Sequence, residues 1–211
     1  MPRRRRAKSP ISTTFIRWHI EKKYNIDFDQ GLDANQKAIA WAFEKMAEDQ
    51  LYWVVVHDRW MNDDNFRKGP VRFFHRVPAP IRPFVIATVR RKVRTALHGH
   101  GFGRHSPDEI VALGTRSIDA IADFLGDKPF FMSSEPTGAD AAIFSFACAV
   151  LCPHFESRTR RAAERHENVP RYVGRMTGAI LSESGGTGRL QGCGVAQRFQ
   201  SSPLGNIACT F

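Results

Sequence analysis

The sequence contains few cysteines, four among 211 residues. Four cysteines cannot supply the disulfide framework of a small secreted protein, and a chain of this length can bury a core without one. Cys148 and Cys152 stand four residues apart on a predicted helix, so we expect both to be buried free thiols. No histidine stands at ligand spacing from them, and we predict no metal site.

Long hydrophobic runs are also missing. The longest one, residues 138–151, is shorter than the ~20 residues that a helix needs to cross a bilayer. The first residues, MPRRRRAKSP, are basic, but they are not followed by the apolar segment of a secretory signal peptide. These absences predict a reduced, cytoplasmic protein with no membrane span.

Acidic residues are absent from one long stretch of this chain, which carries a net charge of +10. From Arg67 to His105 there are ten lysines and arginines and no aspartate or glutamate. Such a stretch suits phosphate, a carboxylate-bearing peptide, nucleic acid or a lipid surface, and it is equally typical of a solvated basic face. The glycines near its end lack the preceding strand and the GK[ST] ending of a nucleotide-binding loop, so we expect a flexible cationic loop. The candidate anion-binding residues are Arg90, Arg91, Arg94, His98, His100, Arg104 and His105.

Helical signals, by contrast, run through the central part of the chain. Residues Ser106-Pro107-Asp108-Glu109 and Thr137-x-x-Asp140 are capping boxes, which satisfy free N–H groups where a helix begins. The segment after Thr137 is apolar on every face, which predicts a helix buried at the centre of a bundle. The fold class is therefore all-α. Helices are predicted over residues 14–24, 35–61, 84–97, 106–125, 137–151, 158–167 and 170–181.

The two ends of the chain differ from this central part. Residues 1–12 carry five positive charges and no periodicity, which predicts a basic disordered arm. Residues 183–211 are rich in glycine, serine and glutamine, and their few apolar residues are scattered. We expect this segment to be a disordered tail.

The segment DKPFFMSSEPTGADAAIF, residues 127–144, resembles the entry to the central helix of the glutathione S-transferase C-terminal domain. The run HGHGFGRH resembles one in the branch of that superfamily that includes metaxin and failed-axon-connections proteins. The resemblance implies a C-terminal-like helical bundle over residues 35–182. It makes residues 13–24 the last helix of an N-terminal thioredoxin-like domain that is otherwise largely absent, since no βαβ pattern precedes them. The acid of the family's acid–Ser pair, which binds glutathione, is also missing, because the aligned residues are Ser12 and Thr13.

The same resemblance implies a function. In transferases of this fold the first long helix of the C-terminal domain lines the substrate pocket, which makes Tyr52, Trp53, Arg59 and Trp60 substrate-pocket candidates. An aromatic stripe at helical spacing is also typical of a buried core. The residue that activates the glutathione thiol belongs to the N-terminal domain, so no catalytic residue is assigned. We expect a truncated glutathione S-transferase family protein, inactive as this chain, with glutathione as a cosubstrate and no bound cofactor.

Two other functions stay open. A non-catalytic, metaxin-like module would hold a protein partner, or a second copy of the chain as a homodimer, through an exposed apolar face. A basic nucleic-acid-binding protein would use the arm and the helix around Arg90–Arg94, and would bind in a salt-dependent way. No helix-turn-helix or base-stacking motif supports the second alternative, so nucleic acid is the least favoured partner.

Overall fold

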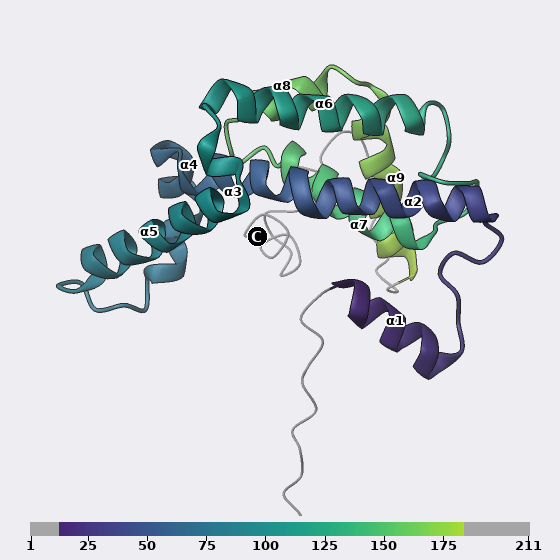
Figure 1. The fold of residues 1–211 in the computed structure, drawn as a ribbon, viewed down its shortest axis with the longest axis horizontal. Helices are drawn as coiled ribbons and strands as arrows, with labels where there is room; N and C mark the ends of the chain where they lie inside the picture. The colour runs from purple at the N-terminus through teal and green to yellow at the C-terminus, as the bar shows by residue number, and fades with distance from the viewer. Residues whose placement is uncertain (1–12, 184–211) are drawn as a thin grey trace, which may run out of the picture.

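The computed structural model describes residues 13–183. These residues form nine α-helices, one π-helix and two 3-10 helices, and no strand (Figure 1), so the all-α prediction is confirmed. The predicted arm at 1–12 and the predicted tail at 183–211, except for Glu183 itself, lie outside the described residues. The elements in chain order are α1 (Thr13–Tyr24), α2 (Ala34–Met46), η1 (Ala47–Leu51), α3 (Tyr52–Trp60), α4 (Asp63–Lys68), η2 (Pro70–Phe74), α5 (Arg82–His100), η3 (Phe102–Arg104), α6 (Pro107–Leu125), α7 (Gly138–Leu151), α8 (Arg158–Glu164) and α9 (Asn168–Glu183).

Helix α7 lies at the centre of the bundle, in contact with α2, η1, α8 and α9. Ile143 and Ala147 are fully buried in the main core, together with side chains of α6 and α9. The prediction that α7 is buried on every side is wrong, because Ala141 and Ser145 are exposed. The buried residues of α7 form a single stripe, and its exposed face of small side chains forms the wall of a groove.

The long helix predicted over 35–61 is interrupted by the π-helical turn η1. A π-turn contains an extra residue, so it rotates the surface of the helix that follows it. Leu51 and Val54 are fully buried, whereas Trp53 and Trp60, which the spacing places inward, are only half-buried. The predicted aromatic stripe is therefore displaced from the core.

Gln50 is a polar residue of the π-turn. Its Nε2 donates to the Ser117 hydroxyl at 2.7 Å and to the Leu113 carbonyl oxygen at 3.2 Å. Ser117 is itself buried, so the glutamine satisfies a polar group inside the bundle. This link joins the π-turn to α6.

A second, smaller core lies where α3, α5, η3 and α6 meet. It contains Leu97 and Phe102, so the run predicted as a flexible cationic loop is ordered here: α5 continues to His100 and η3 follows it. Val93 and Leu97 of α5 face this second core, whereas Phe84 at the start of the same helix is 75% exposed.

Three helices begin with a capping box. The predicted boxes at Ser106 (α6) and Thr137 (α7) are confirmed. A third box, formed by Asp33 and Gln36, begins α2. A cap of this kind contributes about 1 kcal/mol to stability, so three of the long helices have locally determined starts.

Helix α1 lies apart from the rest of the bundle, below it in Figure 1, and residues 25–33 join it to α2. None of its residues is buried. Phe15 and Trp18 are 57% and 51% exposed. Because the core does not hold α1, its position depends on the polar and aromatic contacts of the site.

Candidate functional site

An open groove separates α1 from α7. It encloses about 1010 Å³, which is the upper end of the range for small-molecule sites. Its lining comes from α1, the segment after it, the end of α2, η1, α3 and α7. The lining residues are Thr13, Thr14, Ile16, Arg17, Ile20, Phe28, Glu44, Glu48, Tyr52, Thr137, Gly138, Ala141, Ala142, Ser145 and Phe146.

The groove has apolar walls. Ile16 and Ile20 line it from α1, and Ala141, Ala142 and Phe146 line it from α7. The alanines leave space that larger side chains would fill. Hydroxyl and carboxylate groups of α1, α2 and η1 line the rest, so the arrangement suits a ligand with an apolar part and a polar part.

Arg17 attaches α1 to the bundle. Its guanidinium pairs with Glu21 at 2.9 Å, with Asp29 at 2.6 Å and with Glu44 of α2 at 2.9 Å. Burial lowers the pKa of Arg17, but the hydrogen bonds to Glu21 and Asp29 outweigh this effect, so its pKa lies above the ordinary value. Burial raises the pKa of Glu44 above its usual range, and the charge of Arg17 partly offsets that increase.

Gly138 lets Arg17 approach the start of α7. The Gly138 N–H donates to the Phe28 carbonyl oxygen at 3.0 Å and to an Asp29 carboxylate oxygen at 3.2 Å. A β-carbon at Gly138 would overlap the Arg17 guanidinium. The Asp29 carboxylate thus joins the Arg17 guanidinium, which holds α1, to the first turn of α7. The dipole of α7 favours a negative charge at this end of the helix.

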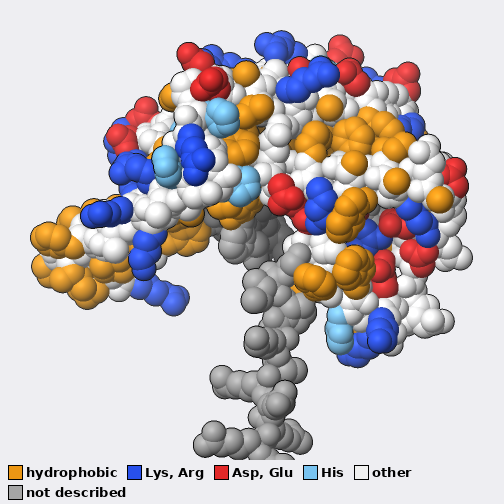
Figure 2. Space-filling model, viewed as in Figure 1, with side chains coloured by type: hydrophobic (Ala, Val, Ile, Leu, Met, Phe, Trp, Pro, Cys, Tyr) orange, Lys and Arg blue, Asp and Glu red, His pale blue; other side chains and the backbone are white. Residues whose placement is uncertain are grey.

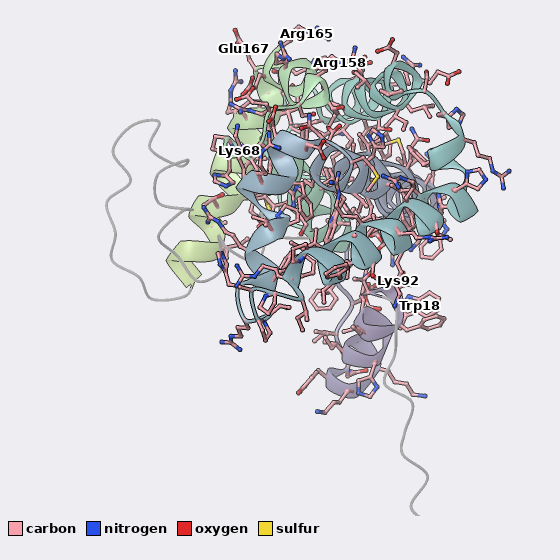
Figure 3. The ribbon with its side chains drawn as sticks, turned by 90° about the vertical axis from the view of Figure 1, so that its left-hand side faces the viewer. Trp18, Lys68, Lys92, Arg158, Arg165 and Glu167 are labelled. Carbon is pink, nitrogen blue, oxygen red and sulfur yellow. The ribbon has the colours of Figure 1, made fainter. Side chains whose placement is uncertain are left out.

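Two aromatic side chains extend the attachment of α1. Trp18, which Figure 3 labels on α1, stacks on Trp41 of α2 with 6.4 Å between ring centroids. Lys45 lies 4.5 Å from the centroid of the Trp41 ring and donates to the Thr14 hydroxyl at 2.8 Å. Lys45 also pairs with Glu48. All of these contacts are at least partly open to solvent.

Of the four predicted substrate-pocket residues, the groove contains only Tyr52. Trp53 and Trp60 pack against the second core. Arg59 is buried, donates to the Ala149 carbonyl oxygen at 2.9 Å and lies over the Phe155 ring at 4.7 Å. Burial lowers its pKa to about 10. Trp53, Arg59 and Trp60 thus lie outside this groove, because the π-turn rotates α3 relative to α2.

The predicted anion-binding residues do not form one site, and Arg90 is already neutralised. Its guanidinium pairs with Asp63 at 2.7 Å and donates to the Trp60 carbonyl oxygen at 3.1 Å. It also lies over the Phe66 ring at 4.7 Å. Arg90 thus joins α5 to α3 and α4.

The other six residues of this set differ in their surroundings. His100 stacks on Trp53 with 4.6 Å between ring centroids, and His105 lies 3.8 Å from the Glu109 carboxylate. The remaining four are exposed, and no carboxylate among residues 13–183 pairs with them: Arg91, Arg94, His98 and Arg104.

The Thr137–Asp140 box connects three parts of the bundle. The Asp140 carboxylate is 0% exposed and accepts from the Thr137 N–H at 2.8 Å and the Thr137 hydroxyl at 2.9 Å. It also accepts from the Phe131 N–H at 2.7 Å and the Tyr172 hydroxyl at 2.9 Å. Burial, and then the charge of Asp140, raise the pKa of Tyr172. The carboxylate thus ties α7 to the loop before it and to α9.

Neither of the two cysteines expected as free thiols offers a reactive group to the groove. Cys148 packs against the main core as a free thiol, and burial raises its pKa to about 12. A thiol with this pKa is almost wholly protonated near neutral pH and reacts slowly. Cys152 follows the last residue of α7 and is buried.

Two kinds of site are absent from the described part of the chain. No group of three or more histidine, cysteine, aspartate or glutamate side chains within residues 13–183 is arranged to hold a metal ion. Each helix in the same range is too short or too polar to cross a membrane.

Comparison with known proteins identifies the class of protein. A family model of the glutathione S-transferase C-terminal domain matches residues 114–176, and one of the glutathione S-transferase N-terminal domain matches residues 5–65. The two matches cover most of the elements that form the groove. The chain is therefore a glutathione S-transferase-like protein.

Curated relatives agree with this class. The chain is 33% identical over 135 residues to Failed axon connections of Drosophila melanogaster, covering 60% of this chain and 32% of that protein. It is 29% identical over 136 residues to isoprene-epoxide–glutathione S-transferase of Rhodococcus sp. (strain AD45), covering 64% and 57%. It is 28% identical over 142 residues to metaxin-1 of Homo sapiens, covering 63% and 30%. The chain thus spans between 30% and 57% of the length of these relatives. No solved structure matches it.

The N-terminal match corrects one prediction. The N-terminal domain was expected to be largely absent, but the model of that domain matches residues 5–65. The described part of this match, from Thr13 onward, consists of helices and the segments that join them, with no strand. The expectation was based on the lack of a βαβ pattern, and this criterion does not recognise a match that lies largely in helical segments.

Proposed function

We propose that this glutathione S-transferase-like protein binds glutathione carrying an apolar substituent on its sulfur, in the groove between α1 and α7. The observation that carries the proposal is the lining of the groove, where apolar side chains face a space of about 1010 Å³ bordered by hydroxyls and carboxylates. The name of the Rhodococcus relative combines an apolar epoxide with glutathione. A conjugate of that kind has one apolar part and one polar part, as the groove has.

Each part of the ligand has a place in this proposal. The apolar substituent lies along Ala141 and Ala142 beside Phe146, where small side chains leave apolar space. The peptide lies at the polar border. The Thr14 hydroxyl accepts from Lys45 and so keeps its own proton for a carboxylate of the ligand.

The test is a calorimetric titration with S-methylglutathione, S-hexylglutathione and S-hexylcysteine. Each methylene buried in the groove should tighten binding about two- to fourfold, so the hexyl conjugate should bind far more tightly than the methyl one. S-hexylcysteine, which lacks the flanking residues of the tripeptide, should bind more weakly than S-hexylglutathione. Equal affinity for the methyl and hexyl conjugates would contradict the proposed apolar site.

A matched pair of variants locates the ligand. Ala141→Trp fills the groove from α7, and Ala87→Trp places the same side chain on α5; both alanines are exposed. We expect Ala141→Trp to abolish binding of S-hexylglutathione and Ala87→Trp to leave it unchanged. An unchanged affinity in Ala141→Trp would exclude the groove as the binding site.

We further propose that α1 supplies a homodimer contact. The exposed aromatic side chains Phe15, Trp18 and Trp41, at 57%, 51% and 46% exposure, lie on or beside it, and exposed aromatic residues of this kind are typical of protein interfaces. Sedimentation velocity over a range of protein concentrations should show a dimer that Trp18→Ala weakens. A monomer at every concentration would rule the contact out.

A further inference from the structure

One end of the molecule combines apolar and basic side chains that the groove does not use. Figure 2 shows a cluster of hydrophobic side chains at its left extremity, where the turn after η2 leads into α5. Phe73, Ile81 and Phe84 are 52%, 51% and 75% exposed. We call these three residues the apolar tip.

The backbone that carries the apolar tip is ordered by specific contacts. Arg82 closes the turn by donating from Nε and Nη2 to the Val77 carbonyl oxygen at 3.1 and 3.0 Å. The Phe73 ring stacks on Trp60, with an interplanar angle of 10° and 6.4 Å between centroids. Helix α5 begins directly after the turn, with Pro83 in its first turn. The exposed side chains are thus held on an ordered support.

Positive charge surrounds the apolar tip. Arg91 lies seven residues after Phe84, about two turns of α5, so both occupy the same exposed side of the helix. Arg94 lies one turn further, and Lys92 is exposed beside them. From Arg67 to His105 the sequence contains no acid, and within residues 13–183 no carboxylate pairs with these three residues of α5. We call Arg91, Lys92 and Arg94 the cationic face.

We propose that the apolar tip and the cationic face together dock the protein on an anionic lipid surface. Apolar side chains that project from a basic helix enter the boundary between headgroups and acyl chains, while the cations attract anionic headgroups. A nucleic acid would use the charges but would gain little from an exposed aliphatic side chain such as Ile81. The combination therefore favours a lipid surface.

The test is co-sedimentation of the full chain with vesicles of phosphatidylcholine alone, and of phosphatidylcholine with phosphatidylserine. Residues 1–12 add five positive charges, which can themselves attract anionic vesicles. Binding of the unaltered chain therefore does not test the proposal by itself, and the test compares it with variants. Phe84→Ala shortens the apolar tip, and Arg91→Gln with Arg94→Gln removes two charges of the cationic face. All three side chains are exposed, so these changes leave the fold intact.

Matched controls use exposed residues elsewhere. Tyr24→Ala removes an aromatic side chain that is 61% exposed on α1. Arg161→Gln with Arg165→Gln removes two exposed charges at α8. Figure 3 labels Arg165 at the top of the view and Lys92 of the cationic face well below it.

We expect sedimentation only with phosphatidylserine. Removing two charges should weaken it about 25-fold, since each cation near an anionic surface contributes roughly a fivefold factor. Phe84→Ala should weaken it roughly tenfold, and both controls should match the unaltered chain. Equal sedimentation of all five proteins, or equal binding to both kinds of vesicle, would overturn the proposal. The proposal would also be overturned if the chain did not sediment with vesicles and instead bound single-stranded DNA in a way that depends on the cationic face and not on Phe84.

Discussion

Replacing Asp140 with alanine should destabilise the protein far more than removing the acid of an exposed capping box. Glu109 occupies the same position in the box at the start of α6, accepts from the Ser106 N–H at 2.7 Å and the Ser106 hydroxyl at 2.9 Å, and is 62% exposed. Water can replace Glu109 after substitution. It cannot reach Asp140, which is 0% exposed.

The magnitude follows from the donors that would lose their acceptor. A buried donor left without a partner costs about 1–3 kcal/mol, and Asp140→Ala strands the N–H groups of Phe131 and Thr137 and the hydroxyl of Tyr172. The Thr137 hydroxyl can rotate to another acceptor. The substitution also removes a buried charge, and the desolvation cost that disappears with it offsets part of this loss. The net decrease in the free energy of unfolding should be about 4 kcal/mol. Glu109→Ala should cost about 1 kcal/mol.

Urea unfolding, followed by circular dichroism, measures both losses. Tyr172→Phe removes one hydrogen bond to a charged group and should cost about 2 kcal/mol. In a double-mutant cycle with Asp140→Ala, the tyrosine substitution should then cost much less, because its acceptor is already gone. If Asp140→Ala and Glu109→Ala cost the same, burial does not distinguish the two boxes and the reasoning fails.

Three further predictions concern α1, the helix contacts and the alkaline pH range. Arg17→Ala should release α1 and speed limited proteolysis of the segment that joins α1 to α2, with a change of less than about 1 kcal/mol in global unfolding, since no residue of α1 is buried. Gly138→Ala should do the same by displacing the guanidinium. Gly114→Ala brings a β-carbon to 2.8 Å from Val54 and should cost about 1–3 kcal/mol, whereas Gly174→Ala meets nothing within 4 Å and should stabilise α9 by about 0.5–1 kcal/mol. Burial raises the pKa of the Cys148 thiol from 9.0 to about 12, so the thiol loses its proton at a lower pH in the unfolded chain than in the folded one. The free energy of unfolding should therefore decrease as the pH rises from 9 toward 12. The Cys148→Ala variant should lack the thiol's share of this decrease.

Each of these predictions has an outcome that would contradict it. Proteolysis of Arg17→Ala at the rate of the unaltered chain would mean that other contacts hold α1. A stabilising Gly114→Ala would mean that the packing against Val54 can relax. Parallel stability–pH curves for Cys148→Ala and the unaltered chain above pH 9 would mean that the thiol is not protected by burial.

Local signals predicted much of this fold because the fold uses them directly. Ser106 and Thr137 have side chains that satisfy the first turn of a helix, and helices begin at both. The central position of α7 followed from its apolar composition. These features depend on neighbouring residues, so they can be read from a short stretch of sequence.

The groove could not be read in this way, because it depends on residues far apart in the chain. Arg17 and Glu44 are 27 residues apart, and Gly138 is 109 residues from Asp29. The rotation introduced by η1 also decides which side chains of α3 face the groove. One signal was available: a glycine in the first turn of α7, between two capping residues, suggests that another group approaches closely there.

The attachment of α1 has a consequence for how this protein can change over time. The bundle folds around α7 without any buried side chain from α1, and ion pairs, hydrogen bonds and aromatic stacking place α1 across the groove. Substitutions in α1 can therefore alter what the groove accepts while the rest of the domain keeps its stability. Ligand preference and foldability are encoded in separate parts of the chain, so selection can act on the first without endangering the second.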